Sequence, residues 1–108
     1  MEVAQASGVA VVIRGQSLPL LAGARDAVRA GMIPGGLLAN REWAGQRVDL
    51  TGVPDETVAL ACDPQTSGGL LAAVAAADAD QFIAAAAQLG VVATVVGEVV
   101  RGKPGTGA

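Results

Sequence analysis

The sequence predicts a small α/β domain with two layers, in which helices cover one short sheet. Its 108 residues are 52% apolar and 16% charged, a balance typical of one globular domain rather than of a disordered chain. Short β-branched runs alternate with stretches of helical periodicity, an order that favours a sheet packed against helices. Trp43 and Phe82 are the only aromatic residues, so Val, Leu, Ile and Ala must form a thin core.

The first two elements are a helix and a strand. Residues Met1–Ser7 are mildly helical by propensity and meet Gly8, a typical residue after a helix C-terminus. We expect this helix to be the end of a longer one. Residues Val9–Ile13 carry β-branched side chains at four of five positions, which predicts a strand covered on both faces.

A second helix and a long connection follow. Ser17 can cap a helix, Pro19 fits its first turn, and an apolar stripe continues until Gly31 ends it. Residues 33–52 read as one irregular connection, because Pro34-Gly35-Gly36 and a polar stretch interrupt the periodicity. A loop this long in so small a domain usually has a function.

The C-terminal half predicts a short helix, a strand, a helix and a strand. Pro54, with two acidic residues after it, opens a helix to about Ala61, although a strand over Val58–Cys62 stays open as an alternative. The remaining expected elements are a strand at Leu70–Val74, a helix capped by Asp78 and ended by Gly90, and a strand at Val91–Val100 interrupted at Gly97-Glu98. These last three could form a βαβ crossover or a split pair. Residues 1–101 form the domain, and residues 102–108 are expected to be a flexible tail.

Composition excludes several classes of function. A net charge of −3 without a basic patch argues against nucleic-acid binding. The absence of His excludes His-based acid/base chemistry, and a single cysteine, Cys62, excludes an internal disulfide or a cysteine zinc cage. No apolar run reaches the roughly 20 residues that span a bilayer, and no signal peptide is legible. We therefore expect a cytoplasmic protein without a membrane partner.

The segment Asp63–Gly69 carries the most informative chemistry. It places a carboxylate, an amide, two hydroxyls and two glycines in seven residues. Such a loop can turn backbone N–H groups toward phosphate oxygens, with Thr66 and Ser67 as further donors and Asp63 orienting a metal or a water. The alternative is a structural turn in which Asp63 and Thr66 cap backbone groups and the glycines supply positive φ. A P-loop is rejected, because no Lys and no helix follow.

The other polar residues have equally plain structural explanations. Asn40 and Arg41 could offer donors to an anion, or their segment could be a helix terminator and a turn. Trp43 fits an anchor for the long connection or an interface residue better than a stacking platform for a nucleotide. We expect Cys62, at the end of an apolar run, to be buried and unreactive, because the neighbouring carboxylate of Asp63 would raise the thiol pKa. The acidic residues at helix starts are expected to be structural: Asp55, Glu56, Asp78 and Asp80.

The run DPQTSGGLL at residues 63–71 is highly specific, and other segments match the same pattern in order: Ser7-Gly8-Val9, Leu18-Pro19-Leu20-Leu21 with Gly23, Ala30-Gly31 to Pro34-Gly35-Gly36, Asn40-Arg41-Glu42, Gly90 and Gly97-Glu98-Val99. With them the chain closely resembles, over nearly its whole length, the C-terminal domain of selenophosphate synthetase (selenide, water dikinase), of the aminoimidazole-ribonucleotide-synthetase-like superfamily. The resemblance implies a small mixed sheet of three to four strands covered by helices.

The resemblance also implies a reaction, in which ATP, selenide and water give selenophosphate, AMP and phosphate with Mg²⁺. In that family the catalytic and metal-binding residues lie in or next to an N-terminal ATP-binding domain, which would be the partner of this chain, and the full-length enzyme would be a homodimer. ATP and Mg²⁺ would belong to the full-length enzyme, and this chain alone would bind neither and be inactive. The residues expected to face the reaction cleft are Gly35, Gly36, Asn40, Asp63, Gln65, Thr66, Ser67, Gly68 and Gly69.

Two departures from the family pattern limit these expectations. Leu37 stands where the family commonly has Thr after Pro-Gly-Gly, so one hydroxyl is lost from that loop. The C-terminus ends in a Gly-rich tail where the family has another strand, which could leave a sheet edge for a second copy. The alternatives are a non-catalytic folding or interaction module with structural loops, and a small acyl- or phosphate-binding protein, which the scarcity of cationic residues near the loops disfavours.

Overall fold

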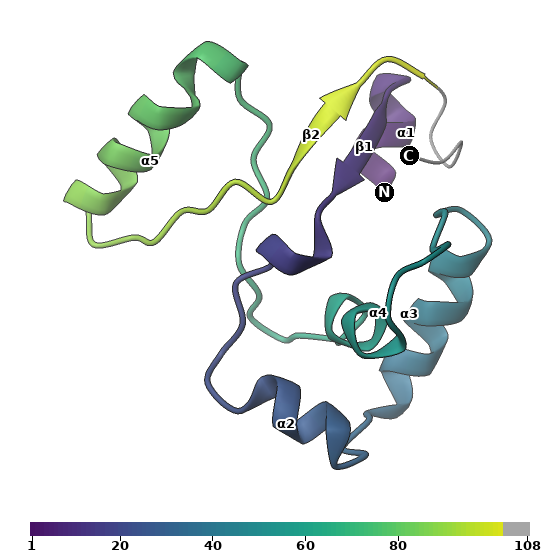
Figure 1. The fold of residues 1–108 in the computed structure, drawn as a ribbon. Helices are drawn as coiled ribbons and strands as arrows, with labels where there is room; N and C mark the ends of the chain where they lie inside the picture. Colours follow the sequence, from purple (N-terminus) through teal and green to yellow (C-terminus); the bar gives the residue numbers. More distant parts are fainter. Residues whose placement is uncertain (103–108) are drawn as a thin grey trace.

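The computed structural model describes residues 1–102 (Figure 1). Apart from Gly102, the expected flexible tail at residues 102–108 lies outside the described residues. The elements in chain order are α1 (Glu2–Ser7), β1 (Ala10–Ile13), the 3-10 turn η1 (Gly15–Ser17), α2 (Ala24–Arg29), α3 (Gly35–Gly45), α4 (Asp55–Ala61), the 3-10 turn η2 (Ala76–Asp78), α5 (Ala79–Gln88) and β2 (Gly97–Val100).

The sheet in residues 1–102 has two strands. β1 and β2 pair antiparallel, with Ala10 opposite Val100 and Ile13 opposite Gly97. The predicted α/β class is confirmed, but the expected count of three to four strands is too high for the described residues. The strand predicted at Leu70–Val74 is absent, as is the first part of the strand predicted at Val91–Val100, so the last three elements form no βαβ crossover.

The missing strands have a physical explanation. A strand needs a neighbour that completes its backbone hydrogen bonds, and residues 70–74 have no such neighbour in the described chain. They also run into alanines, which have low β-propensity. Without that strand, the end of β1 is the one strand beside residues 91–96 in the described chain, and there the amide of Arg14 donates to the carbonyl oxygen of Val96 at 2.8 Å.

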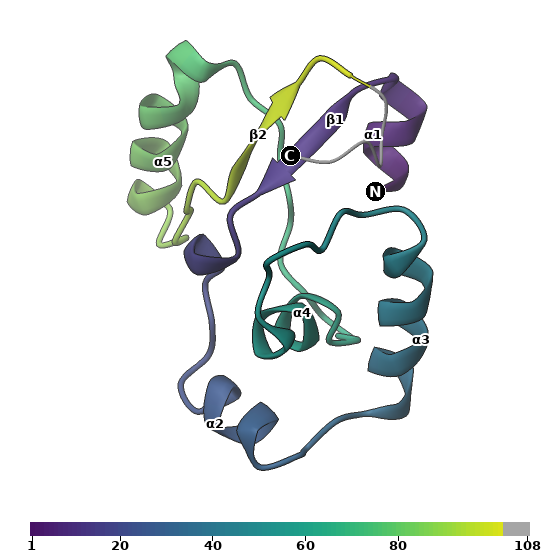
Figure 2. The same cartoon turned by 45° about the vertical axis from the view of Figure 1, so that its right-hand side comes forward.

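The N-terminal helix and strand form as predicted. α1 ends at Gly8, whose φ of 65° is the left-handed conformation that glycine adopts without strain. α1 contacts β1, and Ala4 and Ala10 are buried. This contact brings α1 alongside the strand pair in both ribbon views (Figures 1 and 2).

The second helix is shorter than the sequence predicts. Leu18 precedes Pro19 and is extended, with φ −64° and ψ 124°, because a residue before proline is disfavoured in the helical region. Ser17 therefore ends η1 and caps no helix. α2 begins only after Gly23, whose φ is 83°.

The prediction of an irregular connection over residues 33–52 is wrong, because α3 occupies its centre. Pro34 precedes the first turn with extended backbone, a position where its lack of an N–H costs no helical hydrogen bond. Leu37 is only 2% exposed. Burial of this side chain outweighs the unfavourable helix propensity of Gly35 and Gly36.

α4 joins the helical part of the domain. It forms over Asp55–Ala61 as predicted, and the alternative of a strand at Val58–Cys62 is wrong. α4 contacts α2, α3 and η1, and it lies between α2 and α3 in Figure 2. Val58 and Ala59 are buried.

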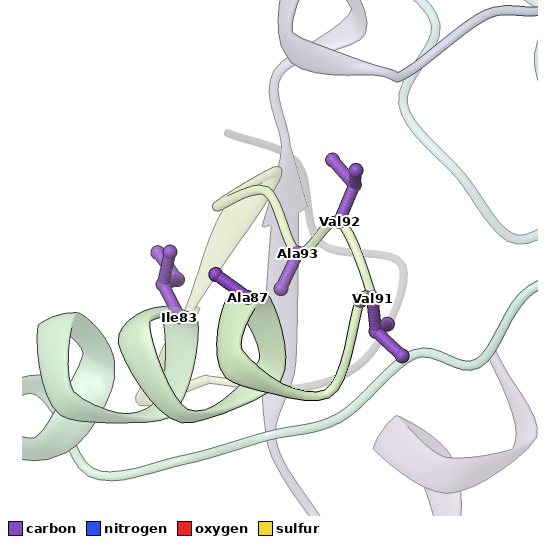
Figure 3. A pocket seen from close by; sticks show the side chains of 6 residues that line it. Ile83, Ala87, Val91, Val92 and Ala93 are labelled. Atoms are coloured by element: carbon purple, nitrogen blue, oxygen red, sulfur yellow. The ribbon is translucent and has the colours of Figure 1, made fainter.

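α5 is set apart from the helices α2, α3 and α4, on the far side of β2 from α1 (Figures 1 and 2). The helix forms and is followed by Gly90, with φ 73°, as predicted. Asp78 precedes it but makes no capping hydrogen bond with its side chain, so the predicted cap is wrong. Ile83 and Ala87 of α5 face residues 91–93 across a shallow apolar hollow of about 360 Å³ (Figure 3).

Large apolar side chains lie exposed in the C-terminal half of the chain. Leu70 is fully exposed, Leu89 is 82% exposed and Val92 is 90% exposed. Within residues 1–102, no helix combines the length and the apolar character that crossing a membrane would require.

Candidate functional site

The Asp63–Gly69 loop connects α4 to the extended segment before η2. All seven of its residues are exposed, and none belongs to a helix or strand. The predicted positive φ is found at neither Gly68 nor Gly69. Within residues 1–102, neither Asp63 nor Thr66 makes a hydrogen bond through its side chain. The features expected of a purely structural turn are therefore missing from this loop.

The glycine at position 68 has a local role in the loop. A β-carbon at Gly68 would lie 2.9 Å from Oε1 of Gln65, so the Gln65 side chain folds over this glycine. At Gly69 a β-carbon would meet no atom within 4 Å. The backbone at Gly69 thus has open space beside it, whereas the missing side chain of Gly68 makes room for the side chain of Gln65.

The structure brings this loop against the first turns of α3. Nδ2 of Asn40 donates a hydrogen bond of 2.9 Å to the carbonyl oxygen of Cys62, the residue before the loop. One turn earlier, a β-carbon at Gly36 would lie 3.1 Å from Cγ of Pro64. Two of the three α3 residues predicted for the site therefore meet the loop, while Gly35 has open space at its β-position.

The two polar side chains predicted to offer donors to an anion both have partners within the domain. Asn40 uses its amide on Cys62, as described above. The guanidinium of Arg41 lies 2.7 Å from Oδ1 of Asp55, at the start of α4. The Cys62 carbonyl and the ring of Pro64 were not predicted as contact points, and no residue spacing could have revealed them, because they depend on how α3 packs.

A second set of ion pairs joins α2 to α4. The guanidinium of Arg25 lies 2.8 Å from Glu56, and Nε of Arg29 lies 2.5 Å from Oε1 of the same carboxylate. Desolvation raises the pKa of Glu56, but the hydrogen bonds and positive charges of Arg25 and Arg29 together outweigh it and lower that pKa below its ordinary 4.5. Glu56 therefore works as a structural carboxylate, as expected from its place in the first turn of α4.

Cys62 is poorly suited to act as a nucleophile. Burial raises the pKa of its thiol above the ordinary 9.0, while the positive charge of Arg41 acts in the opposite direction. The predicted direction is correct and Cys62 is partly buried, but the pKa is raised by this burial rather than by the carboxylate of Asp63. Trp43 is not a loop anchor, because it lies on α3 with the guanidinium of Arg47 4.5 Å from the centre of its ring.

The residues of the loop do not fit a Mg²⁺ site. Asp63 is the only carboxylate in the segment, and the described residues contain no cluster of three or more His, Cys, Asp or Glu side chains that could hold a metal. What the arrangement offers is an exposed surface of hydroxyls, an amide and backbone N–H groups. Such a surface can donate hydrogen bonds to a polar ligand whose charge is neutralised by groups outside this loop.

Comparison with known proteins agrees with the specific motif at residues 63–71. Residues 1–107 match the family "AIR synthase related protein, C-terminal domain". The selenide, water dikinase of Bordetella bronchiseptica is 40% identical over 104 residues, which are 96% of this chain and 30% of that protein. The selenide, water dikinase of Pseudomonas aeruginosa is 39% identical over 100 residues, or 93% of this chain and 28% of that protein.

This chain spans only about 30% of the length of the curated relatives that it matches. The similarity nevertheless extends over nearly all of the chain, including both α3 and the Asp63–Gly69 loop. The chain therefore belongs to the family of AIR synthase related C-terminal domains, and its relatives in this comparison are selenide, water dikinases.

Proposed function

We propose that this chain is the C-terminal domain of a selenide, water dikinase, the enzyme that makes selenophosphate, AMP and phosphate from selenide, ATP and water. The observation that carries the proposal is the position of the Asp63–Gly69 loop. All seven of its residues are exposed, it is rich in donors, and it is held against the first turns of α3. The relatives that match across this segment are named for that reaction.

In this proposal the loop forms one wall of a cleft whose other wall is an ATP-binding domain. Thr66, Ser67 and the backbone amides of Gly68 and Gly69 would shape the wall and donate hydrogen bonds to transferring phosphoryl oxygens. ATP and Mg²⁺ would be bound by the other domain, because the donor set of this chain fits neither a metal nor a triphosphate. Arg41, which follows the loop-contacting residue Asn40 on α3, is already paired with Asp55.

The exposed apolar side chains support a partner domain. Most of the surface of Leu70, Leu89 and Val92 is exposed to water. Exposed apolar surface of this kind favours contact with a partner protein or domain that covers it. We propose that this partner is the ATP-binding domain of the same polypeptide. The full-length polypeptide would form a homodimer in the cytoplasm. The alternative, an interaction module without a catalytic role, would use the same exposed apolar side chains but would not need the polar loop.

The test is a chimera in which this chain replaces the matching 30% of the Bordetella bronchiseptica relative. We expect the purified chimera to form AMP in a selenide-dependent manner. The isolated chain, assayed alongside it, should form none. A folded, ATP-binding chimera without turnover, or robust turnover by the isolated chain, would contradict the proposal.

A further inference from the structure

The Asp63–Gly69 loop has no hydrogen-bonded secondary structure of its own, yet it begins at a fixed point. Among the described residues, none of its own side chains forms a hydrogen bond that would hold it in place. Its N-terminal end is fixed from outside, by α3. The two contacts come from side-chain positions four residues apart on one helix, Gly36 and Asn40, which lie on the same helix face.

The first contact is a hydrogen bond that crosses 22 residues of sequence. Nδ2 of Asn40 donates to the carbonyl oxygen of Cys62 at 2.9 Å, a distance typical of a well-formed bond. The carbonyl lies one peptide before Asp63, so the bond fixes the place where the loop leaves α4. Asp at position 40 would have the same shape but would lack this donor.

The second contact is a close approach between a helix and a proline ring. A β-carbon at Gly36 would lie 3.1 Å from Cγ and 3.4 Å from Cβ of Pro64, which is tighter than ordinary van der Waals contact. A proline ring cannot rotate away as a flexible side chain can, so the loop itself would have to shift. Gly36 is not required for its backbone conformation, because its φ is not positive.

We propose that Asn40 and Gly36 together form a tether by which α3 fixes the position of the Asp63–Gly69 loop, and that Asn40 is a positioning residue for the reaction proposed above. Asn40 then contributes through the peptide carbonyl of Cys62 and contacts no substrate. This role differs from the anion-binding donor that is one of the two interpretations of the sequence, because the amide already donates to the carbonyl oxygen of Cys62. The catalytic part of this inference rests on the proposed function, whereas the tether itself does not.

The tether is tested in the chain alone by the backbone ¹⁵N order parameters of Gln65–Gly69. In the native chain we expect values near the rigid range of about 0.85, and in Asn40→Ala and Asn40→Asp values below about 0.6. Glu42→Ala is the matched control, since residue 42 is exposed on the same helix and lies two positions from Asn40. Unchanged loop order in both Asn40 variants, or a mobile loop in the native chain, would overturn the tether.

The glycine contact has an equally close control. Alanine favours the helix over glycine at both position 35 and position 36, but only at position 36 does its β-carbon meet Pro64. We expect Gly36→Ala to shift the amide resonances of residues 65–69 and Gly35→Ala to leave them in place, with neither variant melting earlier. Equal shifts in the two variants would overturn the role of Gly36, and this pair remains decisive even if an Asn40 variant does not fold.

The positioning role is tested in the chimera. We expect Asn40→Asp to lower kcat about 2- to 10-fold, the effect of one lost neutral hydrogen bond, with KM for ATP unchanged and the melting temperature within a few degrees. A kcat equal to that of Glu42→Ala would overturn the positioning role. If the unsubstituted chimera has no activity, the proposed function fails, while the order parameters still decide the tether.

Discussion

Gly97 lies so close to Val12 that a β-carbon at position 97 would overlap the carbonyl oxygen of Val12 on the neighbouring strand. The backbone of Ile13, which pairs with Gly97, lies only 3.1 Å from the same point. Only glycine permits this approach, and the contact occurs at the start of β2.

This relationship predicts that Gly97→Ala separates the two strands. We expect the substitution to lower the free energy of unfolding by about 1–3 kcal/mol, the range for an added methyl group in a packed site. Gly45→Ala is the control, because its β-carbon would meet nothing within 4 Å. Urea denaturation measures both, and equal stability of the two variants would refute the close approach.

Leu37 is predicted to be the side chain on which the helical part depends most. It is 2% exposed, and Leu37→Ala should lower the free energy of unfolding by about 2–5 kcal/mol through lost burial and the cavity left behind. The neighbouring Leu38 is 61% exposed, so Leu38→Ala should cost far less. Thermal unfolding of the two variants measures the difference. Similar losses of stability would contradict the assignment of Leu37 to the buried face of α3 and Leu38 to the exposed face.

The carboxylate of Glu56 predicts how stability changes in acid. Its pKa is lower in the folded chain than its ordinary 4.5, so its ion pairs stabilise the fold above that pH. This stabilisation should be lost as the pH falls below 4.5 through the folded pKa. Denaturation curves at several pH values should show Glu56→Gln less stable than the native chain at pH 7, and the difference should shrink toward pH 3.

The control for this pH series is Glu2→Gln, at an exposed position in α1. It makes none of the ion pairs between α2 and α4, so at pH 7 it should lower the free energy of unfolding less than Glu56→Gln does. The difference in the free energy of unfolding between the native chain and Glu56→Gln could instead stay constant from pH 7 to pH 3. That result would contradict a stabilising role for the charge of Glu56 in its ion pairs with Arg25 and Arg29.

Cys62 is predicted to react slowly with alkylating agents at neutral pH. Burial raises the pKa of its thiol above 9.0, so the thiolate fraction at pH 7 is small. Arg41→Met should raise that pKa further, because the positive charge of Arg41 lowers it. The rate of iodoacetamide labelling against pH measures both, and a midpoint below 9.0 in the native chain would contradict the assignment.

The sequence predicted the elements whose local signals agree with their packing. Gly8 ends α1, Gly90 follows α5 and the acidic first turn opens α4, as expected. α3 was missed because Pro34, Gly35 and Gly36 resemble a turn, whereas the burial of Leu37 favours a helix there. Local signals cannot report that burial.

For the strands the error is that the sequence predicts more of them than the described residues contain. Residues 70–74 and 91–96 contain β-forming side chains, but in residues 1–102 they have no complete neighbouring strand. Strand formation depends on a partner, which a single segment does not reveal. For the site, the sequence identified the loop and the glycines before α3 as informative segments, but not the contacts of Asn40 and Gly36 that join them.

The most direct test of the central claim is turnover by the chimera after Thr66 and Ser67 are both replaced by Ala. If the Asp63–Gly69 loop serves phosphoryl transfer, selenide-dependent AMP formation should fall at least about 10-fold while the melting temperature stays within a few degrees. Both side chains are exposed, so their removal should leave the fold intact. Unchanged turnover, or a loss of stability without a separate loss of turnover, would show that the loop is only structural and would contradict the account.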